Sequence, residues 1–359
     1  MSSLSGFLRN FFASKSALIT VGLFLFGGIL LALIVLQPKV VTVNLPDQTV
    51  TSTSPKPEYP PLNIEAYNAK LLQLANLKTS SSTTSTPSLW PVKTVYPDGG
   101  AILPFSRIVA YYGNFYSTKM GVLGEYPPQQ VLQMLQATAK QWQEADPSTP
   151  VIPALDYIAV AAQGNPGPDG MYRLRMPADQ IEKAISMANQ IHGLVFLDVQ
   201  VGLSNVETEV PLLEPYLKLP NVELALDPEF AMHNGQKPGT VIGSLTAADV
   251  NFAANFLAKI VKENDLAPKI LVVHRFTQPM LKDYQDIKPL PQVEIVMDMD
   301  GFGPPAEKIK TYQDFIASEP VQFTGFKLFF KNDNRPGSHM MTPQEVLKLS
   351  PQPSYIQYQ

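Results

Sequence analysis

The sequence predicts a (β/α)8 barrel, an α/β fold, and three observations support this class. Short apolar runs that end in a polar, usually acidic, residue recur through the C-terminal two-thirds of the chain. Helix-like stretches separate the runs, as in a barrel of alternating parallel strands and helices. The 359 residues are enough for one barrel of roughly 250 residues and an N-terminal extension. The six clearest runs are 151–160, 194–200, 222–230, 269–276, 293–303 and 323–333.

Two further segments complete the eight strands of a domain that we expect at residues 105–359. Residues 107–115 have the composition of a first strand and residues 354–359 that of a last one. Helix 177–193 has Pro in its first turn and Gly at its end, which are common boundary residues. The helices expected between strands are 127–146, 177–193, 207–219, 246–265, 304–318 and 342–350.

A period-two pattern indicates which faces of the fourth and sixth strands point inward. On each strand one face carries acidic residues and the other carries bulky apolar residues. Because the bulky face packs against the outer helices, the acidic face should point toward the barrel axis. The two inward faces are Glu223, Ala225, Asp227 and Glu229, and Glu294, Val296, Asp298 and Asp300.

The N-terminal region predicts a membrane anchor followed by a spacer. Residues 17–36 carry no charge and are long enough to cross a bilayer as a helix. The alternative is a cleaved signal peptide, whose apolar core is usually only about 7–15 residues. The basic residues of segment 1–16 favour a cytoplasmic N-terminus and an extracytoplasmic barrel. Residues 37–104 read as a Pro-, Ser- and Thr-rich linker with a short helix at 61–77.

Composition excludes several kinds of site. The formal charge is −4, the pI is about 5.6 and no long basic run occurs, so nucleic acid is not expected as a partner. The absence of cysteine excludes disulfides, thiolate metal sites and a cysteine nucleophile.

The C-terminal ends of barrel strands carry chemistry, so the polar residues there are the candidate site. Carboxylates, amides, a histidine and aromatic rings together suit the hydroxyls and apolar faces of a glycan. The candidate substrate-binding residues are Tyr111, Tyr112, Asn114, Asp156, Asp198, Gln200, His274, Arg275 and Lys327.

Glycosidic hydrolysis needs two carboxyl groups, one of them a proton donor. The candidate catalytic residues are Asp227, Glu229, Asp298 and Asp300. A structural alternative remains for several candidates. Asp227 precedes a proline and Asp300 a glycine, as in common turns, and His274 alone could be structural. Lys327 lies in an apolar strand and needs a buried partner.

We expect no cofactor, with a divalent metal as the alternative. Carboxylates and a histidine could hold Mg²⁺, Ca²⁺ or Mn²⁺. The usual zinc signatures are absent from the sequence. The oxygen-rich set would be Asp198, Asp227, Asp298 and Asp300 with His274.

The strand tips Asp227-Pro-Glu-Phe, Asp298-Met-Asp-Gly-Phe-Gly and Tyr111-Tyr-Gly-Asn resemble those of glycoside-hydrolase-type barrels of the bacterial cell envelope. The resemblance covers residues 105–359 and implies a hydrolase with catalytic carboxylates on strands four and six. It departs from the largest glycosidase clan, because strand seven ends in Lys-Asn-Asp without a Glu. The alternatives are a glycan-binding barrel without catalysis and a metal-dependent hydrolase.

Overall fold

The computed structural model describes residues 58–77 and 89–359, which belong to one compact unit from Pro57 to Gln359. The expected anchor at 17–36 and the cytoplasmic segment before it lie outside the described residues, as does much of the expected linker. No helix within the described part of the chain is long and apolar enough to span a membrane.

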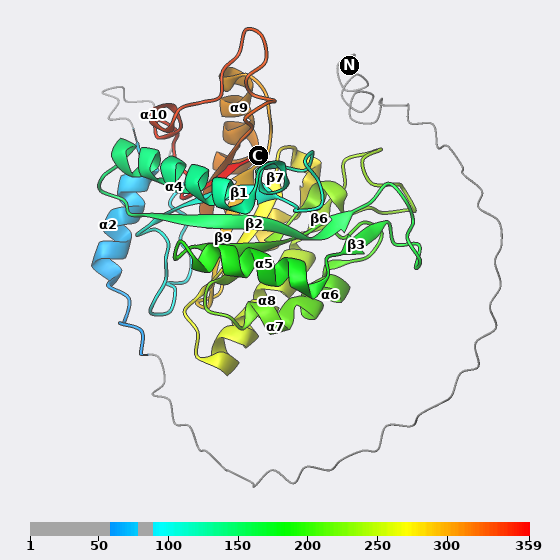
Figure 1. Ribbon diagram of the computed structural model, residues 1–359. Helices are drawn as coiled ribbons and strands as arrows, with labels where there is room; N and C mark the ends of the chain where they lie inside the picture. The colour runs from blue at the N-terminus through cyan, green and yellow to red at the C-terminus, as the bar shows by residue number, and fades with distance from the viewer. Residues whose placement is uncertain (1–57, 78–88) are drawn as a thin grey trace, which may run out of the picture. The chain divides into compact units, whose positions relative to one another are not determined.

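A closed parallel barrel forms the centre of this unit, which confirms the predicted (β/α)8 class (Figure 1). The first strand pairs in parallel with both the second and the last, so the described sheet closes on itself. The eight barrel strands, in chain order, are β1 (Arg107–Gly113), β2 (Val151–Ala162), β4 (Leu194–Val199), β5 (Val222–Leu226), β7 (Lys269–Arg275), β9 (Val293–Met299), β10 (Phe323–Leu328) and β11 (Tyr355–Tyr358).

Helices cover the outside of the barrel, and α4 and α5 flank β2 in Figure 1. The stretch expected as one helix at 207–219 divides into three short pieces, since Pro211 and Pro215 interrupt the backbone hydrogen bonding. The helical elements are α2 (Ile64–Ala75), α3 (Val122–Glu125), α4 (Pro128–Ala145), α5 (Ala178–Asn189), α6 (Val206–Glu209), η1 (Val210–Leu213), α7 (Glu214–Leu217), α8 (Ala247–Asn264), α9 (Pro305–Tyr312), a π-helical turn η5 (Gln313–Ala317) and α10 (Pro343–Val346).

Short strands and 3-10 turns lie in the loops between the barrel strands. β3 (Arg173–Arg175) turns back antiparallel along the end of β2. A two-stranded parallel sheet joins β6 (Leu245–Thr246) to β8 (Leu281–Lys282). Three 3-10 turns follow β5 and β7, at η2 (Pro228–Phe230), η3 (Gln278–Met280) and η4 (Tyr284–Asp286).

The period-two prediction for the barrel strands holds. Val222, Leu224 and Leu226 of β5 pack in the core between barrel and helices. Ala225 of β5 and Val296 of β9 pack in a separate cluster inside the barrel. The acidic residues that alternate with the outward-facing ones therefore lie on the inner face.

The segment before β1 covers the N-terminal end of the barrel. Tyr67 of α2 and Leu103 join the apolar cluster inside the barrel. Glu294 accepts hydrogen bonds from the backbone N–H groups of Ile102 and Leu103, at 3.0 and 2.8 Å. The expected helix at 61–77 is thus α2, and it packs on the barrel rather than standing apart.

Candidate active site at the C-terminal end of the barrel

Polar side chains from all eight barrel strands or the loops directly after them meet at the C-terminal end of the barrel. We call this set the mouth cluster. Most of its members are almost completely buried, although they are charged or polar. Its residues are Tyr112, Asp156, Asp198, Gln200, Asp227, Glu229, His274, Asp298, Asp300, Lys327, Tyr355 and Gln357.

The deepest carboxylate is Asp156 on β2. Its Oδ2 accepts hydrogen bonds from the Tyr355 hydroxyl and the Gln357 amide, each at 2.7 Å, and its Oδ1 has no partner. Burial raises the pKa of Asp156 to about 7, although both hydrogen bonds and Lys327 oppose that rise. A group with such a pKa can hold or release a proton near neutral pH.

Asp227 is held in place by the loop that follows β5. Its Oδ1 accepts a hydrogen bond from the backbone N–H of Glu229 at 3.2 Å and so caps the turn η2. Its Oδ2 accepts one from the amide of Gln200 at 3.1 Å, and that amide also donates to the hydroxyl of Tyr112. Burial, followed by the charge of Asp198, raises the pKa of Asp227 to about 7. The expectation that Asp227 belongs to a turn is correct, and this turn orients Asp227 within the cluster.

His274 lies at the centre of the cluster and is fully buried. Its Nδ1 is 3.0 Å from Asp298 Oδ2 and 3.8 Å from Asp300 Oδ2. Burial, followed by the positive charge of Lys327, lowers the pKa of His274 to about 4. The ring is therefore neutral at pH 7. Burial raises the pKa of its partner Asp298 to about 7.

Lys327 supplies the positive charge of the cluster. Its Nζ donates to Asp300 Oδ2 at 3.1 Å and lies 3.9 Å from the centre of the Tyr112 ring. Burial acts to lower the pKa of Lys327, but the charges of Asp300, Asp227 and Asp298 outweigh it and the pKa is raised. The buried partner that the sequence required for Lys327 is thus Asp300.

Glu229 and Asp300 are the carboxylates of the cluster that keep some exposure to solvent. The side chain of Asp300 is 9% exposed and forms an ion pair with Lys327. The carboxyl of Glu229 makes no hydrogen bond or ion pair within the described part of the chain. Burial, followed by the charges of Asp227 and Asp300, raises the pKa of Glu229 to about 8. The opening therefore presents one protonated and one ion-paired carboxyl group.

The structure does not bring three of the expected substrate-binding residues to the cluster. Tyr111 points outward, and its hydroxyl bonds to Thr138 of α4 at 2.8 Å. Arg275 also points outward, where it pairs with Glu319 and donates to backbone carbonyl groups. Each of them is adjacent in sequence to an inward-facing residue, so the alternation of side chains along the strand places it on the outer face, away from the cluster. Asn114 fixes the loop after β1 through Ile158 and Tyr116.

Tyr355 and Gln357 are members of the cluster that the sequence reasoning missed. They lie on the inner face of β11, two residues apart, and both bond to Asp156. Alternation along β11 predicts that both residues face inward, but this strand carries no acidic residue that would mark it as part of a site.

Within residues 58–77 and 89–359, no group of three or more His, Asp or Glu side chains is arranged to hold a metal ion. In the oxygen-rich set expected for a metal, Asp227 already binds Gln200 and the backbone of Glu229. Asp298 and Asp300 in turn bind His274 and Lys327.

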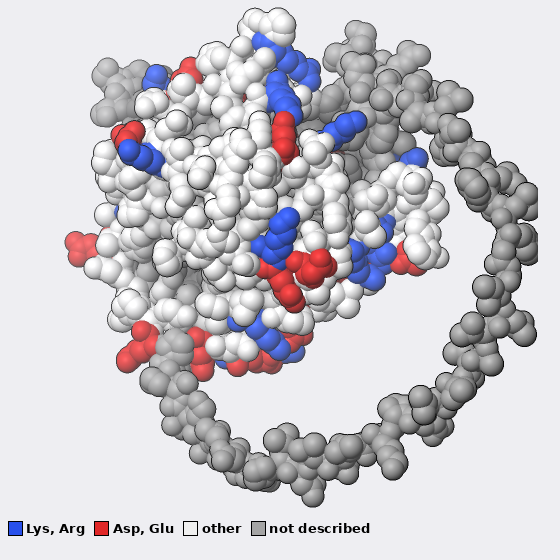
Figure 2. All heavy atoms as spheres, viewed as in Figure 1, with Lys and Arg blue, Asp and Glu red and all other residues white. Residues whose placement is uncertain are grey.

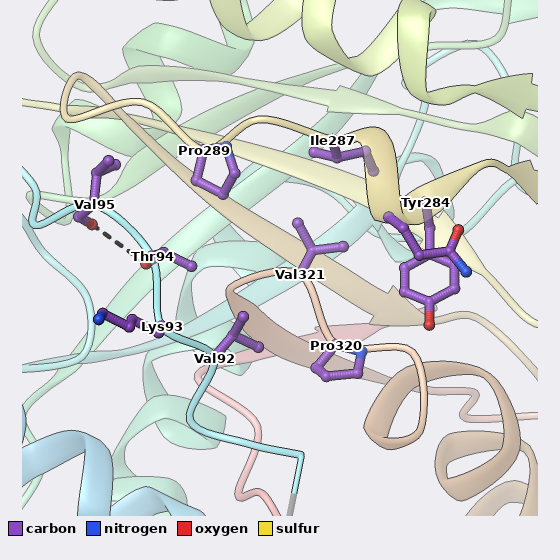
Figure 3. A pocket seen from close by; sticks show the side chains of 10 residues that line it. Val92, Lys93, Thr94, Val95, Tyr284, Ile287, Pro289, Pro320 and Val321 are labelled. Atoms are coloured by element: carbon purple, nitrogen blue, oxygen red, sulfur yellow. Dashed lines mark hydrogen bonds between the residues drawn. The ribbon is translucent and has the colours of Figure 1, made fainter.

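A groove of about 480 Å³ lies away from the mouth cluster (Figure 3). It is formed by residues 92–95, by the segment from Tyr284 to Pro289 and by Pro320 and Val321. Those last two segments precede β9 and β10, so the groove belongs to the N-terminal half of the barrel. Its walls are mainly apolar and contain no carboxylate or histidine, and it lacks the groups that hydrolysis requires.

The surface gives no sign of a strongly charged partner on the face that Figure 2 shows. Acidic and basic side chains lie beside one another in small groups there, and uncharged residues cover most of the face. Several exposed pairs are ion pairs one helical turn apart, such as Lys140 with Glu144 and Lys259 with Glu263.

No protein-family model and no curated protein sequence matches the chain. Among solved structures, a ruminal GH26 endo-beta-1,4-mannanase is 12% identical with a TM-score of 0.37, over 77% of this chain and 66% of that one. The HPPK-DHPS of Plasmodium falciparum with pteroate is 11% identical with a TM-score of 0.35, over 83% of this chain and 52% of that one. This chain thus spans just under two thirds of the first structure and about half of the second.

Similarity at this level carries no argument about activity. The fold assignment rests on the closed parallel barrel of this chain. At the level of the fold, that barrel agrees with the expected resemblance to glycoside-hydrolase-type (β/α)8 proteins.

Proposed function

We propose that the barrel is a glycoside hydrolase that acts on an envelope or environmental glycan through Glu229 and Asp300. The observation that carries the proposal is the difference between these two partly exposed carboxyl groups. Glu229 has a pKa raised to about 8 and no side-chain partner within the described residues, whereas Asp300 is paired with Lys327. Glycosidic hydrolysis needs one carboxyl group that donates a proton and a second that acts as nucleophile or base.

Each carboxyl then has a defined task. Glu229 is protonated at pH 7 and donates its proton to the oxygen of the leaving group. Asp300 is the carboxylate that acts as nucleophile or as the base for water, and Lys327 donates a hydrogen bond to it and orients it. Asp298 and Asp227 are held by His274 and Gln200, and Asp227 also accepts from the backbone N–H of Glu229, which positions that residue.

Glycan is the substrate class because the cluster offers hydrogen-bond acceptors and an exposed aromatic ring lies on the loop after β1. Sugar hydroxyl groups would donate to carboxylate oxygens near the opening, and apolar sugar faces stack on aromatic rings. Tyr116, in the loop after β1, is 61% exposed and offers such a ring.

The direct test is hydrolysis of a panel of soluble polysaccharides and aryl glycosides by the full-length protein in detergent, measured as released reducing ends or aglycone. We expect cleavage of at least one substrate by the wild type and by the control Glu144→Gln, whose side chain is 65% exposed on α4. Glu229→Gln should lose roughly 10²–10⁴-fold in rate. Binding without cleavage would instead identify a glycan-binding barrel, and neither binding nor cleavage across the panel would contradict the proposal.

We also propose that residues 17–36 anchor the protein in a membrane, with the barrel on the extracytoplasmic side. The support is the uncharged run itself, its length and the basic residues before it. Mass spectrometry of the membrane fraction tests this, because an anchored protein retains peptides from before residue 36. A mature N-terminus after Leu36 would contradict it.

A further inference from the structure

His274 lies between two groups of carboxylates that do not touch each other directly. On one side, its Nδ1 is 3.0 Å from Asp298 Oδ2 and 3.8 Å from Asp300 Oδ2. On the other side, its Nε2 is 4.0 Å from Asp198 Oδ2. The ring is therefore the link between a deep carboxyl group and the group at the opening.

The side toward Asp198 is polar and keeps unused hydrogen-bonding capacity, although the hydroxyl of Tyr112 is close enough to Asp198 to lower the pKa of that carboxyl. His274 Nε2 and both oxygens of Asp198 are buried and have no hydrogen-bond partner within the described part of the chain. A gap of 4.0 Å is too long for a direct hydrogen bond, but one water molecule can bridge it. Buried polar atoms are normally satisfied, so a bridging water would supply the partner that His274 Nε2 needs.

We infer that His274 is a proton relay, which connects Asp198 through one bridging water to Asp298 and Asp300. In one transfer, the Asp198 carboxyl gives its proton to the water and the water gives one of its own protons to Nε2. Nδ1 then releases its proton to Asp298. Asp198 has lost one proton, Asp298 has gained one, and the ring has changed tautomer without a change in charge.

The charges around the ring favour this role. A relay of this kind needs a neutral ring with one N–H and one free lone pair. Burial and Lys327 lower the pKa of His274 to about 4, against the opposing charges of Asp300 and Asp227. The edge of the ring also meets the face of Tyr112, with centres 6.1 Å apart.

Asp198 is suited to be the proton store. Burial, followed by the charge of Asp156, raises its pKa well above the ordinary value, which favours the protonated form of this carboxyl. A purely structural His274 would need only its bond to Asp298, and its Nε2 and Asp198 would have no reason to face each other across a polar gap.

The relay rests on the proposed function, since it ends beside Asp300, one of the two proposed catalytic carboxyl groups, but it can be tested without substrate. The experiment is ¹⁵N NMR of His274 in the full-length protein in detergent at pH 7, in the wild type, in Asp198→Asn and in the exposed control Asp179→Asn. In the wild type and control we expect a neutral ring whose two nitrogen shifts are averaged between tautomers. In Asp198→Asn we expect the shifts of a single tautomer with the proton on Nδ1.

A wild-type ring fixed as the Nδ1–H tautomer and unchanged by Asp198→Asn would overturn the relay, as would a positively charged ring at pH 7. The wild-type spectrum decides even if the variant fails to fold. A high-resolution crystal structure adds a second criterion. A water within hydrogen-bond distance of both Nε2 and Asp198 supports the relay, and direct contact between these groups contradicts it. Neither measurement depends on whether a cleaved glycan has been found.

Discussion

The two ends of the barrel both bury carboxyl groups, but they satisfy them differently. At the N-terminal end, Glu294 binds the backbone N–H groups of Ile102 and Leu103. Glu223 likewise accepts from the N–H of Ile270 and lies 3.9 Å from Lys269. At the C-terminal end, the carboxylates face one another, one lysine and a neutral histidine, and several oxygen atoms remain without a partner.

This difference distinguishes buried carboxyl groups that hold the structure together from buried carboxyl groups that are available for chemistry. A carboxylate that binds backbone groups holds the chain in place and is already satisfied. Burial raises carboxyl pKa values at both ends, to about 8 for Glu294, so the mouth carboxylates differ in that they face each other and keep free lone pairs. This arrangement lowers stability but provides acid and base groups. The inner-face positions of Glu294 and Asp298 differ by only four residues of one strand, so depth in the barrel decides the role.

The largest expected effect is on catalysis. Glu229→Gln removes the protonated carboxyl at the opening and should lower kcat by roughly 10²–10⁴-fold, because general acid catalysis is lost. Its thermal unfolding temperature should not fall below that of the wild type, because the side chain binds nothing within the described residues. Equal losses of rate in Glu229→Gln and in the exposed control Glu144→Gln would remove the distinction between reactive and ordinary carboxyl groups.

The next effect is on stability at the N-terminal end. Glu294→Ala leaves the buried N–H groups of Ile102 and Leu103 without an acceptor. Each orphaned group costs about 1–3 kcal/mol, so the free energy of unfolding should fall by about 2–5 kcal/mol. Urea denaturation measures it, with Glu144→Ala as the exposed control, for which a change within about 0.5 kcal/mol is expected. A change as small as that of the control would mean that Glu294 does not hold the segment before β1.

A third change tests how tightly the mouth cluster is built. A Cβ added at Gly325 on β10 would lie 2.5 Å from Asp298 Oδ1 and 3.0 Å from its Cβ. Gly325→Ala should therefore displace Asp298 from His274 and cost about 1–3 kcal/mol of stability. The NMR signals of the His274 ring should move as well. A variant with wild-type stability and an unmoved His274 signal would show that the cluster is looser than the distances indicate.

The smallest effect is a gain in stability from removing a mouth carboxylate. Asp156 has a folded-state pKa of about 7, above its unfolded value of about 3.9. The folded state therefore binds more protons than the unfolded state between about pH 4 and 7, and this contribution to stability is lost as pH rises through that window. Asp227, Asp298 and Glu229 act in the same direction, up to about pH 8 for Glu229.

His274 opposes this trend, because its folded-state pKa of about 4 lies below the ordinary value of about 6.5. One histidine is outweighed by the several carboxyl groups, so the free energy of unfolding should fall between pH 4 and 8. Asp156→Asn should flatten that slope and unfold at a higher temperature than the wild type at pH 8. A lower melting temperature for Asp156→Asn at pH 8 would indicate that Asp156 is structural, like Glu294.

The sequence predicted the barrel and the inner faces because both depend on local period. Alternation along the fourth and sixth strands predicts Asp227 and Asp298 on the inner face, together with Glu223 and Glu294, as the structure has them. On the first and fifth strands, Tyr111 and Arg275 alternate with inward-facing neighbours, and the same rule places both of them on the outer face.

Other features of the site depend on contacts between distant segments and leave no local pattern. The pairing of Lys327 with Asp300 joins two strands, and the sequence indicated only that Lys327 needs some partner. The solvent exposure of Glu229 and Asp300, against the burial of Asp198 and Asp298, is set by the loops that cover the barrel. The alternation of residues along the strands does not indicate which carboxylates are exposed and which are buried.

The most direct test of the account is the pKa of Glu229, measured by ¹³C NMR of its carboxyl carbon in the full-length wild-type protein. The proposed chemistry requires Glu229 to be protonated at neutral pH, since the groups around it disfavour its charge. We predict a titration midpoint near the value of about 8 that the structure indicates. A midpoint near the ordinary value of about 4.3 would contradict the account, because Glu229 would then be ionised at pH 7 and could not serve as the acid.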